Sequence, residues 1–263
     1  MDNAETDVLR VEQAGAVRLL VLNRPRKLNA FSAALLAALE HEVDAALAHE
    51  ETRVLVITGA GARAFSAGND IARLAGMDAM AAHADMLRGQ RLLRRLHESP
   101  KPVVAMVNGL ALGGGFELVL ACDFILAART AAFGFPEITL DTLPGWGGTQ
   151  LAVQWLGLAR TREMVLCGQV HDAAQCQAWG LLTRVCEPAA LREETLAFAA
   201  ILAARHPYAL HMAKRAVQRA AELPLAAGMD FEAASYAANF GTPHARAGLA
   251  QFAARKSASG GQA

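Results

Sequence analysis

The sequence predicts an α/β fold followed by a helical C-terminal region. Up to about residue 145, short runs of Val, Leu and Ile alternate with longer segments whose apolar residues recur every three or four positions, as in folds that alternate strands with helices. Beyond that point the segments are almost all helical, and the last of them are rich in alanine. With 263 residues the chain can bury a substantial core. We expect a core domain over residues 1–200, a helical region over 201–256 and a disordered tail over 257–263.

The first strands and helices follow one another at short intervals. VRLLVL (17–22) predicts a strand, and the turn formers of NRPRKLNA predict a loop after it. Ser32 can cap a helix that continues through apolar residues at helical spacing. RVLVITG (53–59) then predicts a buried strand, and residues 80–98 predict a second helix.

The middle of the chain continues this alternation. KPVVAMVNG (101–109) predicts a strand, the glycine run after it opens a short helix, and CDFILAA (122–128) predicts the next strand. LLTRV (181–185) is expected to be extended, and everything beyond Pro207 to be helical. Further helices are expected over residues 147–157, 161–168, 172–179 and 188–205.

Composition and charge exclude several classes of protein. The 25 Lys and Arg residues balance the 25 Asp and Glu residues, so no overall charge attracts nucleic acid or an anionic membrane. The four cysteines form no C-x-x-C pair, which argues against disulfides and a zinc knuckle and favours a cytoplasmic location. The start, MDNAETDVLR, resembles neither a signal peptide nor a transit peptide, and no apolar run reaches the ~18 residues needed to span a bilayer. We expect a soluble protein with neither a membrane nor a nucleic acid as its partner.

One glycine-rich segment superficially matches a dinucleotide-binding loop. A strand leads into Gly59, Gly61 and Ala64 with the spacing G-x-G-x-x-A. That fingerprint requires a helix beginning on the glycines, whereas Ser66 and Gly68 interrupt any helix here. We therefore do not expect a dinucleotide site.

The segment AFSAGND (64–70) allows two interpretations. Small residues after a strand are typical of a plain surface turn. A loop of this kind can also aim a free backbone N–H, here that of Asn69, at an anionic oxygen. The residues of this segment alone favour the turn.

The segment ALGGGFEL places Gly113, Gly114 and Gly115 ahead of Glu117 at the start of a short helix. Glycines let a ligand approach the backbone closely, and the N–H groups at a helix start favour negative charge. The alternative is tight packing of the helix on a strand, with Glu117 as an ordinary first-turn charge. The apolar flanks would bury Glu117, however, and buried carboxylates are rare unless they are paired or functional.

A second carboxylate follows in FGFPEITLDTLPGWGGTQ (133–150). Glu137 could be an exposed loop residue, but only one predicted strand separates it from Glu117, so both side chains can converge at one side of the sheet. Two carboxylates facing one small cavity form a general acid/base pair. The sequence has no H-E-x-x-H zinc motif and no G-x-S-x-G nucleophile turn, and we expect no metal.

Four segments together, NRPRKLNA, AFSAGNDI, KPVVAMVNGLALGGGFELVLACDFILAA and FGFPEITLDTLPGWGGTQ, resemble the crotonase superfamily (the enoyl-CoA hydratase/isomerase family) in order and spacing. The resemblance covers about residues 8–256. It implies a crotonase (ClpP-like) spiral of repeated ββα units, with a C-terminal helical region that builds homotrimers, often paired into hexamers. It also implies an acyl-CoA thioester as the substrate, so that CoA is part of the substrate and no separate cofactor is needed.

The resemblance also assigns roles to residues. It implies an oxyanion hole made by the backbone N–H groups of Asn69 and Gly114, and it makes Glu117 and Glu137 the catalytic carboxylates. Phe240 and Arg255 are expected to reach CoA from a neighbouring subunit. The other candidates for binding the substrate and its CoA portion are Lys27, Leu28, Ala30, Ala67, Asp70, Ile71, Gly145 and Trp146.

The implied activity depends on the two glutamates. Hydratases of the family have glutamate at both positions, so the chain most resembles an enoyl-CoA hydratase, a hydro-lyase that reversibly adds water syn to a trans-2-enoyl-CoA, as in the β-oxidation of fatty acids. Glu117 would help to activate the water for attack at C3, while Glu137 exchanges the proton at C2 and the oxyanion hole stabilises the enolate. Two alternatives stay open: a Δ3,Δ2-enoyl-CoA isomerase that uses Glu137 alone, and a non-catalytic member of the family that binds acyl-CoA or RNA.

Three residues depart from the usual pattern of the family, and one of them, Ala247, stands where the C-terminal motif often has an acid that would serve the CoA end. Asn69 stands where alanine is more usual, which leaves a backbone donor intact but can narrow the pocket. Trp146 stands where a small residue is common. A bulky ring beside Gly145 predicts a shorter acyl site and a preference for short acyl chains.

Overall fold

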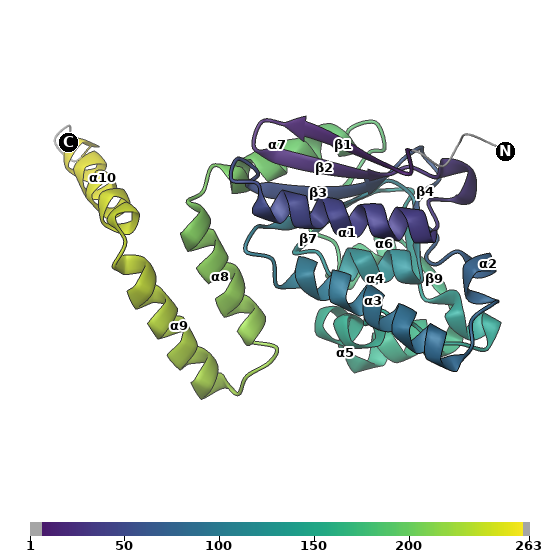
Figure 1. Ribbon diagram of the computed structural model, residues 1–263. Coiled ribbons are helices and arrows are strands. Elements are labelled where there is room, and N and C mark those ends of the chain that lie inside the picture. Colours follow the sequence, from purple (N-terminus) through teal and green to yellow (C-terminus); the bar gives the residue numbers. More distant parts are fainter. Residues whose placement is uncertain (1–6, 260–263) are drawn as a thin grey trace. The chain divides into compact units, whose positions relative to one another are not determined.

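The computed structural model describes residues 7–259. They form two compact units that divide between Ala203 and Ala204, three residues beyond the predicted boundary. Among the residues described, all strands belong to the first unit, and the second unit is built of helices (Figure 1).

The first unit is built on a six-stranded sheet, in which all neighbouring strands are parallel except the first two, which form a hairpin. In spatial order the strands are β1 (Leu9–Ala14), β2 (Val17–Leu22), β3 (Val54–Gly59), β5 (Val103–Val107), β7 (Phe124–Ala128) and β10 (Arg184–Cys186). Strands β2, β3, β5 and β7 lie within the predicted strands. Strand β1 was not predicted, because most of its side chains are exposed and form no apolar run.

A second sheet consists of four short strands. Three of them each follow a strand of the large sheet, and the fourth lies at the edge of the second sheet. In spatial order they are β4 (Ala64–Ser66), β6 (Leu110–Leu112), β8 (Ala132–Gly134) and β9 (Val170–Asp172). Strands of three residues are too short for a periodic pattern to reveal them.

The order of strands and helices repeats along the chain. A long strand, a short strand and a helix recur as β3–β4–α3, β5–β6–α4 and β7–β8–α5, and the antiparallel strand β9 then closes the second sheet. This is the spiral of ββα units implied by the resemblance. The helices after the short strands are α2 (Ile71–Leu74) and α3 (Ala79–His97), α4 (Gly114–Leu120), α5 (Gly148–Cys167) and α6 (Ala173–Ala178). Helix α5 joins two predicted helices across Gly157, whose φ of +74° interrupts the helical geometry.

The large sheet has a buried core on both faces. Along β2, Leu20 and Leu22 join the cluster that contains the buried side of α1 (Ala33–Ala48), whereas Leu19 and Val21 join the cluster on the side of α7 (Leu191–Ala203). This alternation is the two-residue period of a strand. Figure 1 shows α1 running along the strands on the near side, with α7 behind them.

The second unit contains α8 (Pro207–Arg219), α9 (Leu225–Phe240) and α10 (Pro243–Ser259). Helix α9 packs against both of the others. Helix α10 continues three residues into the tail that was expected to be disordered; residues 260–263 of that tail lie outside the described residues. Among residues 7–259, no helix is long and apolar enough to cross a bilayer.

Candidate active site

Glu117 lies in the first turn of α4 and is buried, with 1% of its surface exposed. Its Oε1 accepts hydrogen bonds from the backbone N–H groups of Trp146, at 2.8 Å, and Gly148, at 2.7 Å. Gly148 is the first residue of α5, so one carboxyl oxygen is held at a helix start. Burial raises the pKa of Glu117 to about 7 against the opposing effect of these donors, and the neighbouring Glu137 raises it further.

Glu137 stands in the 3₁₀ helix η2 (Pro136–Leu140), directly after β8. Burial raises the pKa of this carboxyl to about 7 as well. Its Oε2 is buried and has no hydrogen-bond partner among the residues described. A Cβ on Gly113 would lie 2.9 Å from Oε1, so the glycine run of ALGGGFEL provides the space for this side chain.

Two free backbone donors lie next to each other near the carboxyls. No acceptor for the N–H groups of Asn69 and Gly114 occurs within residues 7–259. A Cβ on Gly68 would lie 2.9 Å from the nitrogen of Gly114, and a Cβ on Gly114 would lie 3.7 Å from the nitrogen of Asn69. Gly68 has a φ of +87°, a backbone angle that favours glycine. Two N–H groups arranged in this way can bind an oxygen that becomes negatively charged during a reaction.

The two carboxyls and the two N–H donors line a single cavity of about 120 Å³. A water molecule needs about 10–15 Å³ of space for its centre, so the cavity has room for several water-sized groups. Most of the other residues lining it are apolar, among them the predicted Ala67, Ile71 and Gly145. The structure thus brings into one cavity every residue to which the sequence analysis gave a catalytic or oxyanion role.

The predicted CoA-binding residues near the N-terminus lie in a loop that is hydrogen-bonded to the AGND loop, residues 67–70. Lys27 belongs to the 3₁₀ helix η1 (Pro25–Lys27), and Leu28 and Ala30 follow it. The carbonyl of Leu28 accepts a hydrogen bond from the N–H of Ala67 at 2.9 Å. Lys27, Leu28 and Ala30 are not part of the cavity lining.

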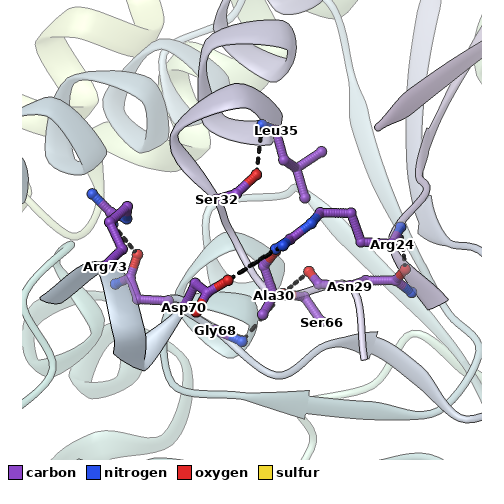
Figure 2. Close-up of polar contacts among 10 residues, drawn as sticks. Arg24, Asn29, Ala30, Ser32, Leu35, Ser66, Gly68, Asp70 and Arg73 are labelled. Atoms are coloured by element: carbon purple, nitrogen blue, oxygen red, sulfur yellow. Dashed lines mark hydrogen bonds and ion pairs between the residues drawn. The ribbon is translucent and has the colours of Figure 1, made fainter. Parts of the chain in front are cut away.

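Arg24 and Asn29 hold the two loops together, and neither was predicted. Arg24 donates to the carbonyl of Ala30 at 2.6 Å and forms an ion pair with Asp70 at 3.2 Å (Figure 2). The buried amide of Asn29 donates to backbone carbonyls of β4 and of the turn before it. Asp70 therefore supports the loop through Arg24. The arginine of NRPRKLNA and the aspartate of AGND lie 46 positions apart, and nothing local in the sequence pairs them.

The ring of Trp146 is packed in the core next to the site. Its indole ring is buried, 5.0 Å from the ring of Phe31, and a Cβ on Gly89 of α3 would lie 2.3 Å from ring atoms. The ring lies behind Gly114 of the cavity, where an added Cβ would be 3.6 Å from its Cε3; its effect on the length of the acyl site stays a prediction. A glycine on α3 leaves a hole that the ring fills, and Trp146 serves the site through its backbone N–H to Glu117.

The last two predicted residues belong to the second unit. Phe240 ends α9, where its ring stacks 5.9 Å from that of Tyr236 and lines a pocket with His206 and His244. Arg255 lies in α10, and its side chain is outside the described part of the chain. The roles of both residues in binding CoA stay predictions.

Comparisons with known proteins agree along nearly the whole chain. The model of the enoyl-CoA hydratase/isomerase family matches residues 12–261. A probable enoyl-CoA hydratase of Rhizobium meliloti (strain 1021) is 40% identical, over 96% of this chain and 97% of that protein. The 2,3-dehydroadipyl-CoA hydratase of Escherichia coli (strain K12) is also 40% identical, over 93% and 94%. The crystal structure of "Enoyl-CoA Hydrates Subunit I" from Geobacillus kaustophilus HTA426 superimposes with a TM-score of 0.90 at 39% identity, covering 96% of this chain and 97% of that one.

Proposed function

The chain belongs to the enoyl-CoA hydratase/isomerase family, and from this premise we propose that it acts as one of the family's hydratases. The enzyme is a hydro-lyase that reversibly adds water to a trans-2-enoyl-CoA and forms the 3-hydroxyacyl-CoA. The observation that carries the proposal is the single small cavity that contains both carboxyls and both free N–H donors. An isomerase needs one acid/base group, whereas hydration needs one group for the water and one for C2.

The cavity can hold the reacting water between the two carboxyls. Oε1 of Glu117 is occupied by two backbone donors, which leaves Oε2 to accept a hydrogen bond from a water. The unpartnered Oε2 of Glu137 supplies the second contact. A water held in this way is oriented before C3 arrives, so little freedom is lost in the transition state.

The two raised pKa values fit the proton transfers that the reaction requires. Near pH 7 one proton is shared by the pair, because two neighbouring buried carboxylates do not both ionise readily. The ionised Glu117 takes a proton from the water as its oxygen bonds to C3. The protonated Glu137 gives its proton to C2, and proton exchange between the carboxyls restores the starting state.

The N–H groups of Asn69 and Gly114 act on the thioester oxygen. As water adds to C3, negative charge moves through C2 to this oxygen, and two donors already in place stabilise it. One donor of this kind is worth about 3 kcal/mol in other enzymes.

The remaining features of the enzyme follow as parts of the same proposal. The small cavity favours a short acyl chain, and the substrate's CoA portion makes a separate cofactor unnecessary. We place the enzyme in the cytoplasm, in fatty-acid β-oxidation, as a homotrimer or a dimer of trimers. Free cysteines at four positions support a reducing compartment. Among residues 7–259 no group of three or more His, Cys, Asp or Glu side chains could hold a metal ion, and the mechanism needs none.

The proposal is tested by mixing the purified protein with crotonyl-CoA and no added cofactor. We expect the absorbance of the conjugated enoyl thioester to fall, with 3-hydroxybutyryl-CoA as the product. No fall at high enzyme concentration would refute the hydratase. Conversion of a 3-enoyl-CoA to the conjugated isomer without hydration would favour the isomerase instead, and RNA retained on a filter at physiological salt would favour the RNA-binding alternative.

A further inference from the structure

We propose that the side-chain amide of Asn69 is a third donor at the oxyanion hole, adding its Nδ2–H to the backbone N–H groups of Asn69 and Gly114. The inference rests on the proposed function, since it assigns this amide to the oxygen of a bound thioester. It gives Asn69 a catalytic side chain in addition to its backbone N–H, and it makes Arg73 the residue that positions this side chain.

The orientation of the amide is fixed by an arginine. Oδ1 of Asn69 accepts a hydrogen bond from Nη2 of Arg73 at 2.8 Å. A guanidinium has only donors, so the amide oxygen, and not the nitrogen, must face it. Figure 2 shows Arg73 beside the loop that carries Gly68 and Asp70.

Arg73 is itself held in place by a carboxylate of the neighbouring helix. Both of its terminal nitrogens bond to Asp85 of α3, one of them at 3.0 Å. Asp85 is buried, with 8% of its side chain exposed, and 16% of the Arg73 side chain is exposed. A two-bonded pair with this little solvent contact is more rigid than a surface ion pair, so the chain Asp85–Arg73–Asn69 holds the amide in one orientation.

With Oδ1 facing Arg73, Nδ2 faces Gly114. A Cβ on Gly114 would lie 3.4 Å from Nδ2 and 3.7 Å from the backbone nitrogen of Asn69. Both nitrogens of Asn69 therefore approach the same glycine, whose own N–H is the other oxyanion donor. Nδ2 is thus placed at the thioester end of the cavity, where the acyl carbonyl must lie for the two backbone donors to reach it.

The amide nitrogen also lacks an acceptor. No hydrogen bond from Nδ2 occurs among the residues that the structure describes, although Asn69 lines the cavity. A donor without a partner beside an apolar wall gains most from a ligand that brings an acceptor. The thioester oxygen is such an acceptor, and it becomes a better one as the enolate forms, so this contact strengthens in the transition state.

The test compares Asn69→Ala with the wild-type enzyme. Alanine keeps the backbone N–H and is the more usual residue at this position in the family, so the fold is retained. The probe is butyryl-CoA labelled with ¹³C at the thioester carbonyl, which binds without a double bond to hydrate. Isotope-edited infrared spectra report how strongly the bound carbonyl is polarised. We expect the lowest stretching frequency in the wild type and a higher one in Asn69→Ala, together with a fall in kcat on crotonyl-CoA of about tenfold or more and a smaller change in KM.

Two further variants separate this role from a structural one. Arg73→Met frees the amide to rotate and should shift the carbonyl frequency in the same direction by less. Arg95→Gln breaks the ion pair of Arg95 with Asp44 further along α3 and should change neither frequency nor kcat. An Asn69→Ala enzyme with the wild-type carbonyl frequency would overturn the inference. A fall in the kcat of Asn69→Ala that occurs only with substrates carrying a polar acyl chain would overturn it as well. The spectrum can be measured even if crotonyl-CoA is not hydrated, so failure of the hydratase proposal is a separate result.

Discussion

Replacing Glu117 with glutamine should sharply lower the rate of hydration and, at alkaline pH, make the protein more stable. Glutamine keeps the shape of the side chain, and its Oε1 can accept the same two hydrogen bonds from Trp146 and Gly148. It has no ionised form, so it cannot take a proton from water. We expect kcat on crotonyl-CoA to fall by about 10²- to 10⁴-fold, the usual contribution of an acid/base group.

The gain in stability follows from the raised pKa. In the unfolded chain the carboxyl has its ordinary pKa of 4.5, whereas burial raises the pKa to about 7 in the fold. Such a group contributes its full stability below pH 4.5 and loses it as the pH rises through 7, because the unfolded chain ionises first. At about 1.4 kcal/mol per pH unit the total loss is about 3 kcal/mol, of which about 2 kcal/mol falls between pH 5.5 and 8.5. The Glu117→Gln protein does not lose this stability, because glutamine does not ionise.

Thermal unfolding at the two pH values measures the difference. For a chain of this size 2 kcal/mol corresponds to roughly 4–8 °C in Tm. The Tm of Glu117→Gln minus that of the wild type should therefore rise by this amount from pH 5.5 to pH 8.5. Glu187→Gln is the matched control, since this carboxyl is mostly exposed and paired with Arg129 at the surface. A difference in Tm that stays constant or falls with pH would refute the argument from burial, and hydration at the wild-type rate would refute the catalytic role.

Three other predictions follow from the same geometry. Because both carboxyls have a pKa of about 7, kcat should be highest near neutral pH. Below that pH the base is protonated, and above it the acid is ionised. A kcat that stays constant from pH 5 to 9 would contradict the shared proton. Gly113→Ala adds a Cβ 2.9 Å from Oε1 of Glu137 at a φ of +52°, so kcat should fall about tenfold or more. Gly15→Ala is the control: its φ is similar, at +58°, but the added Cβ meets open space, so this variant should lose stability and keep its activity. Gly89→Ala puts a Cβ 2.3 Å from the indole of Trp146 and should lower the free energy of unfolding by about 1–3 kcal/mol, as urea denaturation would measure; an unchanged midpoint would contradict the packing.

The sequence predicted the parts of the fold that are long and apolar. The strand over residues 17–22 was found because it is a nearly continuous buried apolar run, and the helix that begins after Ser32 because its buried side chains recur every three or four positions. The short strands of the second sheet carry no such pattern, and only the family resemblance implied them. The exposed strand over residues 9–14 was missed for a related reason, since its pairing with β2 is made by the backbone.

The candidate site shows the same division between local and distant signals. Glu117 stands out in the sequence because a charge in an apolar run is unusual, and the structure buries it. The partners that orient the site come from elsewhere in the chain: Trp146 lies 29 positions from Glu117, and Asp85 lies 12 positions from Arg73. No local pattern connects such pairs. The place of the Trp146 ring could not be inferred either, because it depends on a hole left by a glycine on another helix.

The balance of forces on Glu117 favours the catalytic interpretation of ALGGGFEL over an ordinary first-turn charge. A solvent-exposed carboxylate in a first turn would have its pKa lowered by the neighbouring N–H groups. Here burial outweighs them, and the pKa rises to about 7. A purely structural cap gains nothing from this arrangement, since a neutral amide would accept the same bonds without the cost of burying a charge. An acid/base group requires it, because a carboxyl near pKa 7 can both take and return a proton at neutral pH. The stability that Glu117→Gln should gain at alkaline pH therefore measures how much free energy of unfolding the protein loses by keeping an ionisable carboxyl at this buried position.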